Sequence, residues 1–312
     1  MTDLQIAITA GAAIVVLWII VVTIREWRAL RQRLSDTEVV VDEPMFAVPT
    51  ERLVEQVAPS PISEAIATLR WQAPMTVTRI QQELRGWRHV GSKPIYFGWQ
   101  RNPDAMFLAE SGEGSVVGLQ VGVLLATRSG PIHAMEYSEW QEALGRIARS
   151  LGAQLDLPTM NDVLSRARQL DQQCAAVDAQ LALVITASHV LSASSIASAA
   201  HAAGLEVRGD ARFAMGPLHH QRFSVFPGQN GNTIVLLLDA PRTPSPEQAF
   251  DEMVECAQRM AALLTADVTD ESGRLLSPTD IEQIRQQVLQ RAQALAQLGI
   301  TAGESIAQRL FL

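Results

Sequence analysis

The chain has 312 residues, enough for a membrane segment together with one large domain or two small ones. Its 25 basic and 33 acidic residues give a formal net charge of -8, which argues against a nucleic-acid-binding protein. Its two cysteines, Cys174 and Cys256, lie in stretches with helical patterns, and we expect small buried hydrophobic residues rather than a disulfide or a metal site.

The first predicted element, in residues 1–34, is a transmembrane helix from Ile6 to Ile24. This segment of 19 residues carries no charge and has nearly the ~20 residues that cross a bilayer. A signal peptide is not expected for two reasons. The residues before the apolar segment include Asp3 and no basic residue, and a basic segment follows the apolar one directly. The positive-inside rule places the amino terminus outside and the following residues in the cytoplasm, beginning with Arg25, Arg28, Arg31 and Arg33. A buried core helix is the alternative.

Residues 35–60 are predicted to form a linker. They contain six acidic residues against one arginine, and prolines stand at positions 44, 49 and 59. Such a composition argues against a packed unit. As a flexible coil it would span on the order of 30 Å, which keeps the following residues near the membrane.

The next part, residues 61–178, shows the patterns of strands interrupted by helices. A glycine at position 86 ends the first of these helices. We predict strands over 65–71, 94–99, 105–109 and 119–125, and helices over 77–84 and 138–151.

Residues 179–312 show a similar series of elements. A second long helix is expected to begin with Ser245 as its cap and Pro246 in its first turn. Apolar residues from Phe250 to Leu264 follow helical spacing and predict a buried stripe. The predicted strands are 181–187, 205–213, 222–226 and 233–238, with a short helix over 192–203.

The two series suggest a repeat. From Ala65 to Ala126 is 62 residues, and from Gln180 to Ala240 is 61. Identity between the copies is low, so the repeat depends on order and spacing alone, and any α+β domain could give this order by chance. We therefore expect an α+β protein with two tandem domains, 61–178 and 179–312, each an antiparallel sheet with helices on one face.

One strand of the second copy is unusual, because it is apolar on both of its faces. Antiparallel sheets usually have one solvated face, and the strand at 119–125 alternates accordingly. Over 233–238, in contrast, Val235 and Leu237 are apolar opposite an apolar core face, and Phe213 and Phe226 could extend this second surface. Such a surface needs a partner, either the other repeat or a peptide of another protein.

The sequence contains no catalytic constellation. The glycines of GEGSVVG (112–118) miss the dinucleotide-binding spacing and indicate a hairpin turn. The only histidine pair, His219 and His220, is expected in a solvated loop, because adjacent side chains on a strand point in opposite directions. We expect neither an enzyme nor a cofactor or small-molecule substrate.

The acidic stretch TADVTDESGRLLSPTD (265–280) could suggest a calcium loop. Counted from Asp267, however, an EF-hand would need a glycine where Ser272 stands and a glutamate where Pro278 stands. The stretch instead predicts two short strands, 266–269 and 274–276, joined by a turn over 270–273. Ser277 would then cap the last helix, with Asp280 in its first turn.

The second copy resembles the ZipA family of bacterial cell-division proteins, from about Gln180 to Leu298. This resemblance implies an amino-terminal membrane span, a linker and a cytoplasmic domain that binds FtsZ. The linker here is shorter and more acidic than is usual in that family, and the first copy resembles the family only through the repeat. The stretches that carry the resemblance are AAGLEVRGDARF (202–213), TIVLLLDAP (233–241), EQAFDEMVECAQRMAALL (247–264) and GRLLSPTDIEQIRQQV (273–288).

In that family the carboxy-terminal tail of FtsZ lies in a shallow hydrophobic groove on the open face of the sheet. The resemblance places the groove on the same face that the apolar alternation indicates. Its residues here would be Ala182, Val184, Ala211, Phe213, Phe226, Val235 and Leu237.

The expected function is that of a non-enzymatic, single-pass adaptor of the bacterial inner membrane. It would have a periplasmic amino terminus and a mainly cytoplasmic chain at the division site. Its partners would be the FtsZ tail and, through the first helix, the lipid bilayer. The alternative is a membrane-anchored structural protein whose two repeats pack face to face and bind another division or envelope protein.

Overall fold

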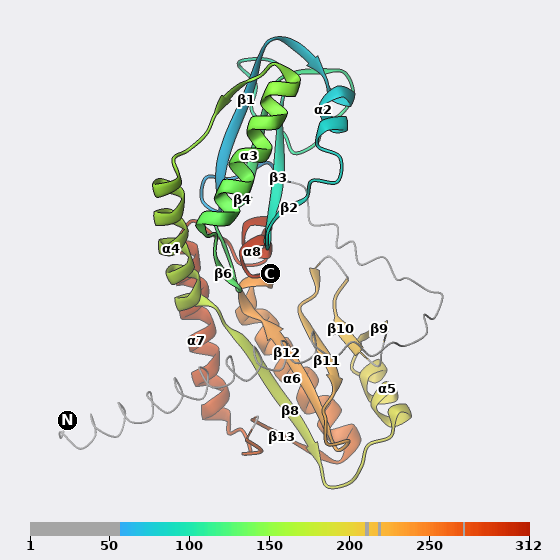
Figure 1. Ribbon diagram of the computed structural model, residues 1–312. Helices are drawn as coiled ribbons and strands as arrows, with labels where there is room; N and C mark the ends of the chain where they lie inside the picture. Colours follow the sequence, from blue (N-terminus) through green and yellow to red (C-terminus); the bar gives the residue numbers. More distant parts are fainter. Residues whose placement is uncertain (1–56, 210–211, 218–219, 271) are drawn as a thin grey trace, which may run out of the picture. The chain divides into compact units, whose positions relative to one another are not determined.

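The computed structural model describes residues 57–312, except for 210–211, 218–219 and 271 (Figure 1). The chain divides into two compact units, Met1–Glu51 and Arg52–Leu312, and every described residue belongs to the second. The predicted membrane helix, with Ile6, Ile24 and the four arginines after it, lies outside the described residues. Among the helices that are described, none is long and apolar enough to cross a membrane.

The first half of the described chain forms an antiparallel sheet, called sheet 1. Its strand order is β2-β3-β4-β1-β7. A short hairpin of β5 and β6 follows β4 and forms a separate pair. The strands are β1 (Glu64–Thr76), β2 (His89–Val90), β3 (Lys93–Gln100), β4 (Ser115–Leu124), β5 (Ala126–Thr127), β6 (Gly130–Pro131) and β7 (Gln154–Asp156).

Helices cover one face of sheet 1. Ala67 of β1 and Val121 of β4 are paired in the sheet and fully buried, and they belong to the same hydrophobic cluster as Trp140 of the long helix. This helix begins with a capping box between His133 and Glu136, which satisfies backbone groups at its start. The two helices are α2 (Val77–Glu83) and α3 (Ala134–Leu151).

The second half forms another antiparallel sheet, called sheet 2, in the order β13-β8-β12-β11-β10-β9. Its central strand β12 pairs with β8 on one side and with β11 on the other. The strands are β8 (Gln180–Ala187), β9 (Glu206–Gly209), β10 (Arg212–Met215), β11 (Phe223–Pro227), β12 (Thr233–Asp239) and β13 (Ala266–Thr269).

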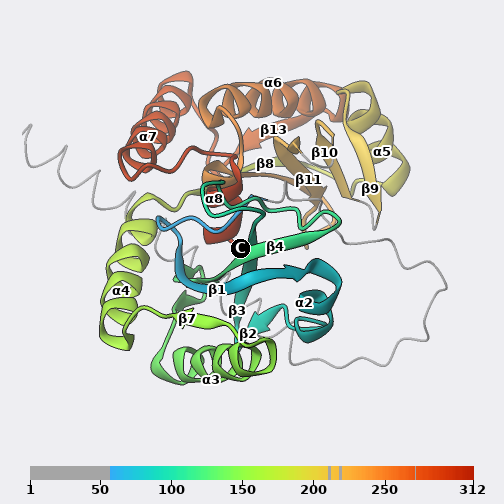
Figure 2. The same ribbon diagram turned by 90° about the horizontal axis from the view of Figure 1, so that it is seen from above.

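Two helices, α5 (Ala193–Ala202) and α6 (Pro246–Leu264), lie along one face of sheet 2 (Figure 2). The predicted apolar stripe of α6 is confirmed, because the residues of this stripe are buried from Phe250 to Leu264. Together with alternate residues of β8 and β12 they form the second hydrophobic cluster. Cys256 belongs to this cluster and Cys174 to that of sheet 1, so both are buried free thiols, as predicted.

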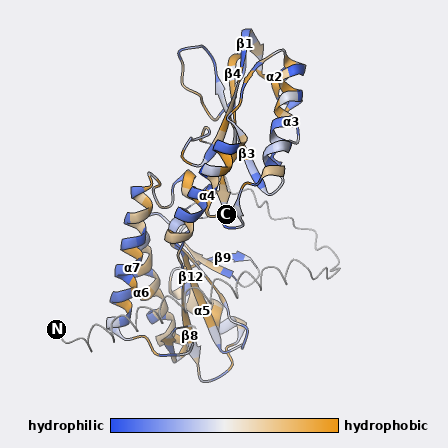
Figure 3. Cartoon of the chain, turned by 60° about the vertical axis from the view of Figure 1, so that its left-hand side comes forward, coloured by the Kyte–Doolittle hydropathy of each residue, from blue (hydrophilic) through white to orange (hydrophobic). Residues whose placement is uncertain are grey.

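The remaining helices join or flank these two layers. Much of the length of α4 and α7 is hydrophilic (Figure 3). The end of the chain nevertheless contributes to the first core, since Ile300, Leu310 and Phe311 are buried in the cluster of sheet 1. These elements are α4 (Met160–Val177), the 3-10 turn η2 (Ala240–Arg242), α7 (Pro278–Gln297) and α8 (Ser305–Leu310).

The two sheets correspond in their strand order. In sheet 1, β1 lies between β4, which comes before α3, and β7, which follows α3. In sheet 2, β8 lies between β12, which comes before α6, and β13, which follows α6. In this way β1, β4 and β7 correspond to β8, β12 and β13. The expected mixed α+β fold with antiparallel sheets is confirmed, whereas the repeat itself stays a prediction.

Several local predictions are wrong. The single strand predicted over 205–213 is instead two antiparallel strands, β9 and β10. Residues 105–109 form no strand apart from a single bridge between Leu108 and Trp99, because the Gln100 side chain binds loop carbonyls of Pro103 and Ala105 instead. Ser245 is not a side-chain cap of α6. Its backbone is left-handed, with φ +46°, whereas a capping serine needs an extended backbone.

The acidic stretch after α6 forms the predicted turn. Gly273 adopts a φ of +83° and donates its N–H to the Asp270 carbonyl at 3.0 Å. Only β13 is a full strand here, and the second predicted strand is reduced to a bridge between Leu275 and Thr269. The predicted cap is confirmed, since Ser277 and Asp280 form a capping box at the start of α7.

Candidate partner-binding face

The face of sheet 2 that points away from α5 and α6, called the outer face of sheet 2, is apolar at its centre. Along β12, Ile234, Leu236 and Leu238 are fully buried toward the helices. Val235 and Leu237 alternate with them, point to the outer face and are half-buried. The structure therefore confirms that β12 is apolar on both of its faces.

Strand register brings five of the predicted groove residues together. Val235 is paired with Val184 of β8 and with Phe226 of β11. Leu237 is paired with Ala182 in the next row. All five side chains are partly exposed, and cross-strand neighbours of this kind form one continuous surface.

The structure does not bring Phe213 to this surface. Phe213 is paired with Val225, which is paired with Leu236, and this row faces the helices and is buried. The predicted strand 205–213 is two strands, β9 and β10, which pair antiparallel with a register shift between Arg212 and Phe213, so one alternation cannot run along 205–213. Ala211 lies outside the described residues.

By strand register Ala214 lies on the outer face of sheet 2, but it is fully buried and adds nothing to the partly exposed surface. It is paired with Ser224, which is itself paired with Leu237. The sequence does contain a signal for the change from one strand to two, because the pair Gly209–Asp210 is typical of a hairpin turn and Gly209 adopts a φ of +85°.

Polar residues bound the outer face of sheet 2 at both ends. At one end the hydroxyls of Thr186 and Thr269 are 3.1 Å apart and form a hydrogen bond between β8 and β13. At the other end the side chain of Gln180 donates to Asp239 at 3.3 Å. The apolar rows lie between these two polar borders.

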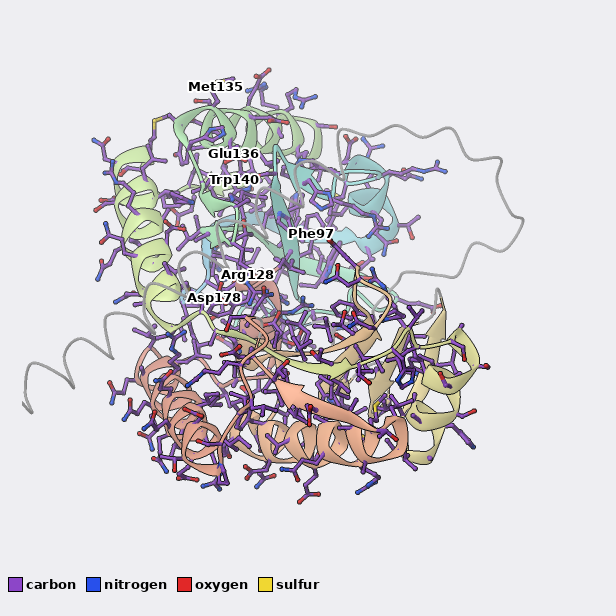
Figure 4. The ribbon with its side chains drawn as sticks, turned by 90° about the horizontal axis from the view of Figure 1, so that it is seen from below. Phe97, Arg128, Met135, Glu136, Trp140 and Asp178 are labelled. Carbon is purple, nitrogen blue, oxygen red and sulfur yellow. The ribbon has the colours of Figure 1, made fainter. Side chains whose placement is uncertain are left out.

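Asp239 also belongs to a cluster of charges that joins the two halves, called the junction. Arg128, between β5 and β6, lies beside Asp178 (Figure 4). It donates hydrogen bonds to both carboxylate oxygens of Asp178, at 2.6 and 2.9 Å, and to both of Asp239, each at 2.7 Å. It also donates to the Phe311 carbonyl at 2.7 Å and stacks over the Phe311 ring. Burial by itself lowers the pKa of Arg128, but the bonds to Asp239 and Asp178 outweigh this effect and raise it.

The described residues contain no cluster of three or more His, Cys, Asp or Glu side chains placed to hold a metal ion. Two acids of the 265–280 stretch, Asp270 and Asp280, have protein partners instead. Asp270 accepts hydrogen bonds from Ser272 and Arg274, and Asp280 accepts them from Ser277.

Comparison with known proteins bears on this half of the chain. Residues 216–287 match the family model described as ZipA, C-terminal FtsZ-binding domain. The resemblance to the ZipA family is thus confirmed for this region. A search of curated proteins found no match to the chain.

The part that matches ZipA begins just after β10 and ends within α7. It contains Phe226, Val235 and Leu237, which are three of the five residues on the outer face of sheet 2. Ala182 and Val184 precede the matched part, and strand pairing alone places them beside the other three.

Proposed function

We propose that the chain is a membrane-anchored adaptor that binds the carboxy-terminal tail of FtsZ on the outer face of sheet 2. The observation that carries the proposal is the row Val184–Val235–Phe226, with Leu237 beside it. It forms a partly exposed apolar surface on a domain that matches the ZipA FtsZ-binding domain. The helix from Ile6 to Ile24 would hold this domain at the inner membrane, with residues 61–178 as a diverged repeat.

An apolar sheet face suits a peptide ligand for a physical reason. Burial of apolar surface supplies roughly 25 cal/mol per Å² before the cost of ordering the peptide is subtracted. Because the side chains are small or medium in size and half-buried, the surface is shallow, and we expect several apolar peptide residues to share the contact. The net charge of -8 gives no reason to expect an acidic partner.

The alternative, in which the two repeats cover each other face to face, has less support. On the corresponding face of sheet 1, the atoms that lie over Gly98 and Gly122 belong to Ala58, Pro59, Glu64 and Phe107. These residues all belong to the first half. The covering of sheet 1 thus does not need sheet 2, which favours an outer face of sheet 2 that is open to a partner.

Binding is tested by titrating the chain with FtsZ and with FtsZ that lacks its carboxy-terminal tail. We expect binding only to intact FtsZ, and equal binding to both forms would exclude the tail mechanism. Leu237→Asp is expected to weaken binding at least tenfold, because it places a charge in the apolar row. The matched control is Leu263→Asp on α6, where a leucine 56% exposed takes the same substitution away from this face.

The tether is tested separately with lipid vesicles. The full chain should bring FtsZ to the vesicles, and the chain without residues 1–34 should still bind FtsZ but leave it in solution. FtsZ recruitment by the shortened chain would contradict the proposed role of the Ile6–Ile24 helix.

A further inference from the structure

The outer face of sheet 1, which points away from α2 and α3, has glycines at its centre. Gly98 lies in β3, and Gly118 and Gly122 lie in β4. In sheet 2, the corresponding strand β12 presents Val235 and Leu237 instead. A glycine inside a strand commonly marks a place where another part of a chain approaches closely.

The approaching part is the end of the predicted linker. A Cβ atom on Gly122 would lie 2.7 Å from the Cβ of Pro59, and one on Gly98 would lie 3.0 Å from its Cδ. The same Cβ on Gly98 would lie 3.5 Å from the Cβ of Ala58. Pro59 is buried in this position. A larger residue at Gly122 would therefore collide with the proline ring.

The loop after β3 covers the adjoining part of this face. Phe107 lies 3.3 Å from the Cβ position of Gly98 and 3.4 Å from that of Gly118. The proline and phenylalanine rings thus cover adjacent parts of the glycine-lined surface.

A buried ion pair anchors the linker end on both sides of Pro59. Arg309 of α8 is 2% exposed, donates to the Val57 carbonyl, and donates to Glu64 at 3.1 Å. Glu64 is fully buried and accepts the Ser60 N–H at 2.6 Å. The Arg309 guanidinium also lies 3.7 Å from the centroid of the Tyr96 ring. The last helix of the chain therefore holds the segment that precedes the first strand.

We propose that residues 57–60 are an internal ligand of a second peptide-binding face, the outer face of sheet 1, and keep it closed to other peptides. Sheet 1 corresponds to sheet 2 in strand order, so this face corresponds to the candidate partner-binding face. This face fits an apolar peptide whose proline packs on the glycines and whose backbone carbonyl accepts a hydrogen bond from Arg309. Because the internal ligand is part of the same chain, its effective concentration is in the millimolar range, and weaker free peptides are excluded.

The position of residues 57–60 on this face is tested by a disulfide between Ala58→Cys and Gly98→Cys in the full chain. The 3.5 Å Cβ separation is within the range that a disulfide requires. We expect the bond to form on mild oxidation, and not in the control Ala58→Cys/Gly130→Cys, because Gly130 has no neighbour within 4 Å of its Cβ position. Cys174 and Cys256 should not interfere, since burial raises the pKa of their thiols to about 12 and about 11. Failure of the first pair to cross-link would overturn the proposal.

Closure of the face is tested by trapping a peptide from solution. The probe is a synthetic peptide of residues 52–62 with a cysteine in place of Ala58, carried as a mixed disulfide with a small thiol. In the full chain with Gly98→Cys, the thiolate at position 98 attacks the peptide sulfur, and the small thiol leaves. With Pro59 intact we expect slow trapping, and with Pro59→Asp at least tenfold faster trapping. Equal rates with and without Pro59→Asp would overturn the proposal.

A second variant that releases residues 57–60 from the face distinguishes their displacement from misfolding of the chain. Pro59→Gly removes the ring without adding a charge and should also accelerate trapping, with an unchanged circular dichroism spectrum. Adding Gly122→Val to either variant should abolish the acceleration, because the valine occupies the space of the proline ring. Fast trapping that persists with Gly122→Val would show that the peptide does not use this seat.

Discussion

Replacement of Arg128 by methionine would test whether the junction holds the two halves of the described chain together. Arg128 binds the carboxylates of Asp178 and Asp239 with four hydrogen bonds, and the three side chains are only 14%, 18% and 22% exposed. Methionine preserves much of the side-chain volume but leaves two carboxylates close together without their cation. Removal of one partner from a buried ion pair costs about 3–5 kcal/mol. That is a large part of the ~5–15 kcal/mol by which folded domains are stable.

The distribution of aromatic residues makes this effect measurable in each half separately. Trp71, Trp87, Trp99 and Trp140 lie in the first half, and the sequence has no tryptophan after position 140. During urea unfolding of the chain without residues 1–34, which lacks Trp18 and Trp27, tryptophan fluorescence therefore reports on the first half, whereas circular dichroism reports on the helices of both. We expect the two transitions to coincide in the wild type and to separate in Arg128→Met, because the junction no longer couples the halves.

A rescue variant distinguishes loss of the ion pair from loss of packing. Arg128→Met combined with Asp178→Asn and Asp239→Asn removes the unpaired charges and should recover at least half of the lost free energy of unfolding. Coincident transitions in Arg128→Met, or a loss below about 1 kcal/mol, would refute the reasoning, because the junction would then be no more than a surface ion pair.

Three further predictions concern single sites. Phe213→Asp should lower the free energy of unfolding by more than about 3 kcal/mol in urea titration, since Phe213 is in the core and the change leaves both a cavity and a buried charge. The pKa of Asp280 is lowered by hydrogen bonds from Ser277, and that of Asp270 is lowered because hydrogen bonds from Ser272 and Arg274 outweigh the effect of burial. A depressed folded pKa stabilises the turn above the unfolded value and not below it. The protection of the amides over 270–280, measured as the exchange rate relative to the intrinsic rate at the same pH, should therefore fall as the pH drops below about 4, and constant protection would contradict this. The buried thiols of Cys174 and Cys256 should react with a thiol reagent only on unfolding, and fast reaction of the native chain would contradict their burial.

Periodicity predicted those parts of the fold in which local pattern and burial agree. The stripe of α6 was readable because a helix buries residues at fixed spacing, and the capping box at Ser277 is a local arrangement of neighbouring residues. The same alternation placed Val235 and Leu237 on the outer face of β12. The prediction failed for Phe213, because the single strand expected over 205–213 is two antiparallel strands whose pairing also shifts at the start of β10.

The sequence by itself determined the elements and the ZipA-like character of the second half, because both depend on residues that are close along the chain. Only the tertiary structure decided what covers each sheet. The glycines of sheet 1 read as one polar side of a strand, yet Pro59 covers that side, and Arg309 holds the segment in place by binding the Val57 carbonyl 252 positions away. Arg128 likewise finds partners 50 and 111 positions away. Contacts between such distant residues leave no periodic trace, since they depend on how whole elements pack rather than on the spacing within any one of them.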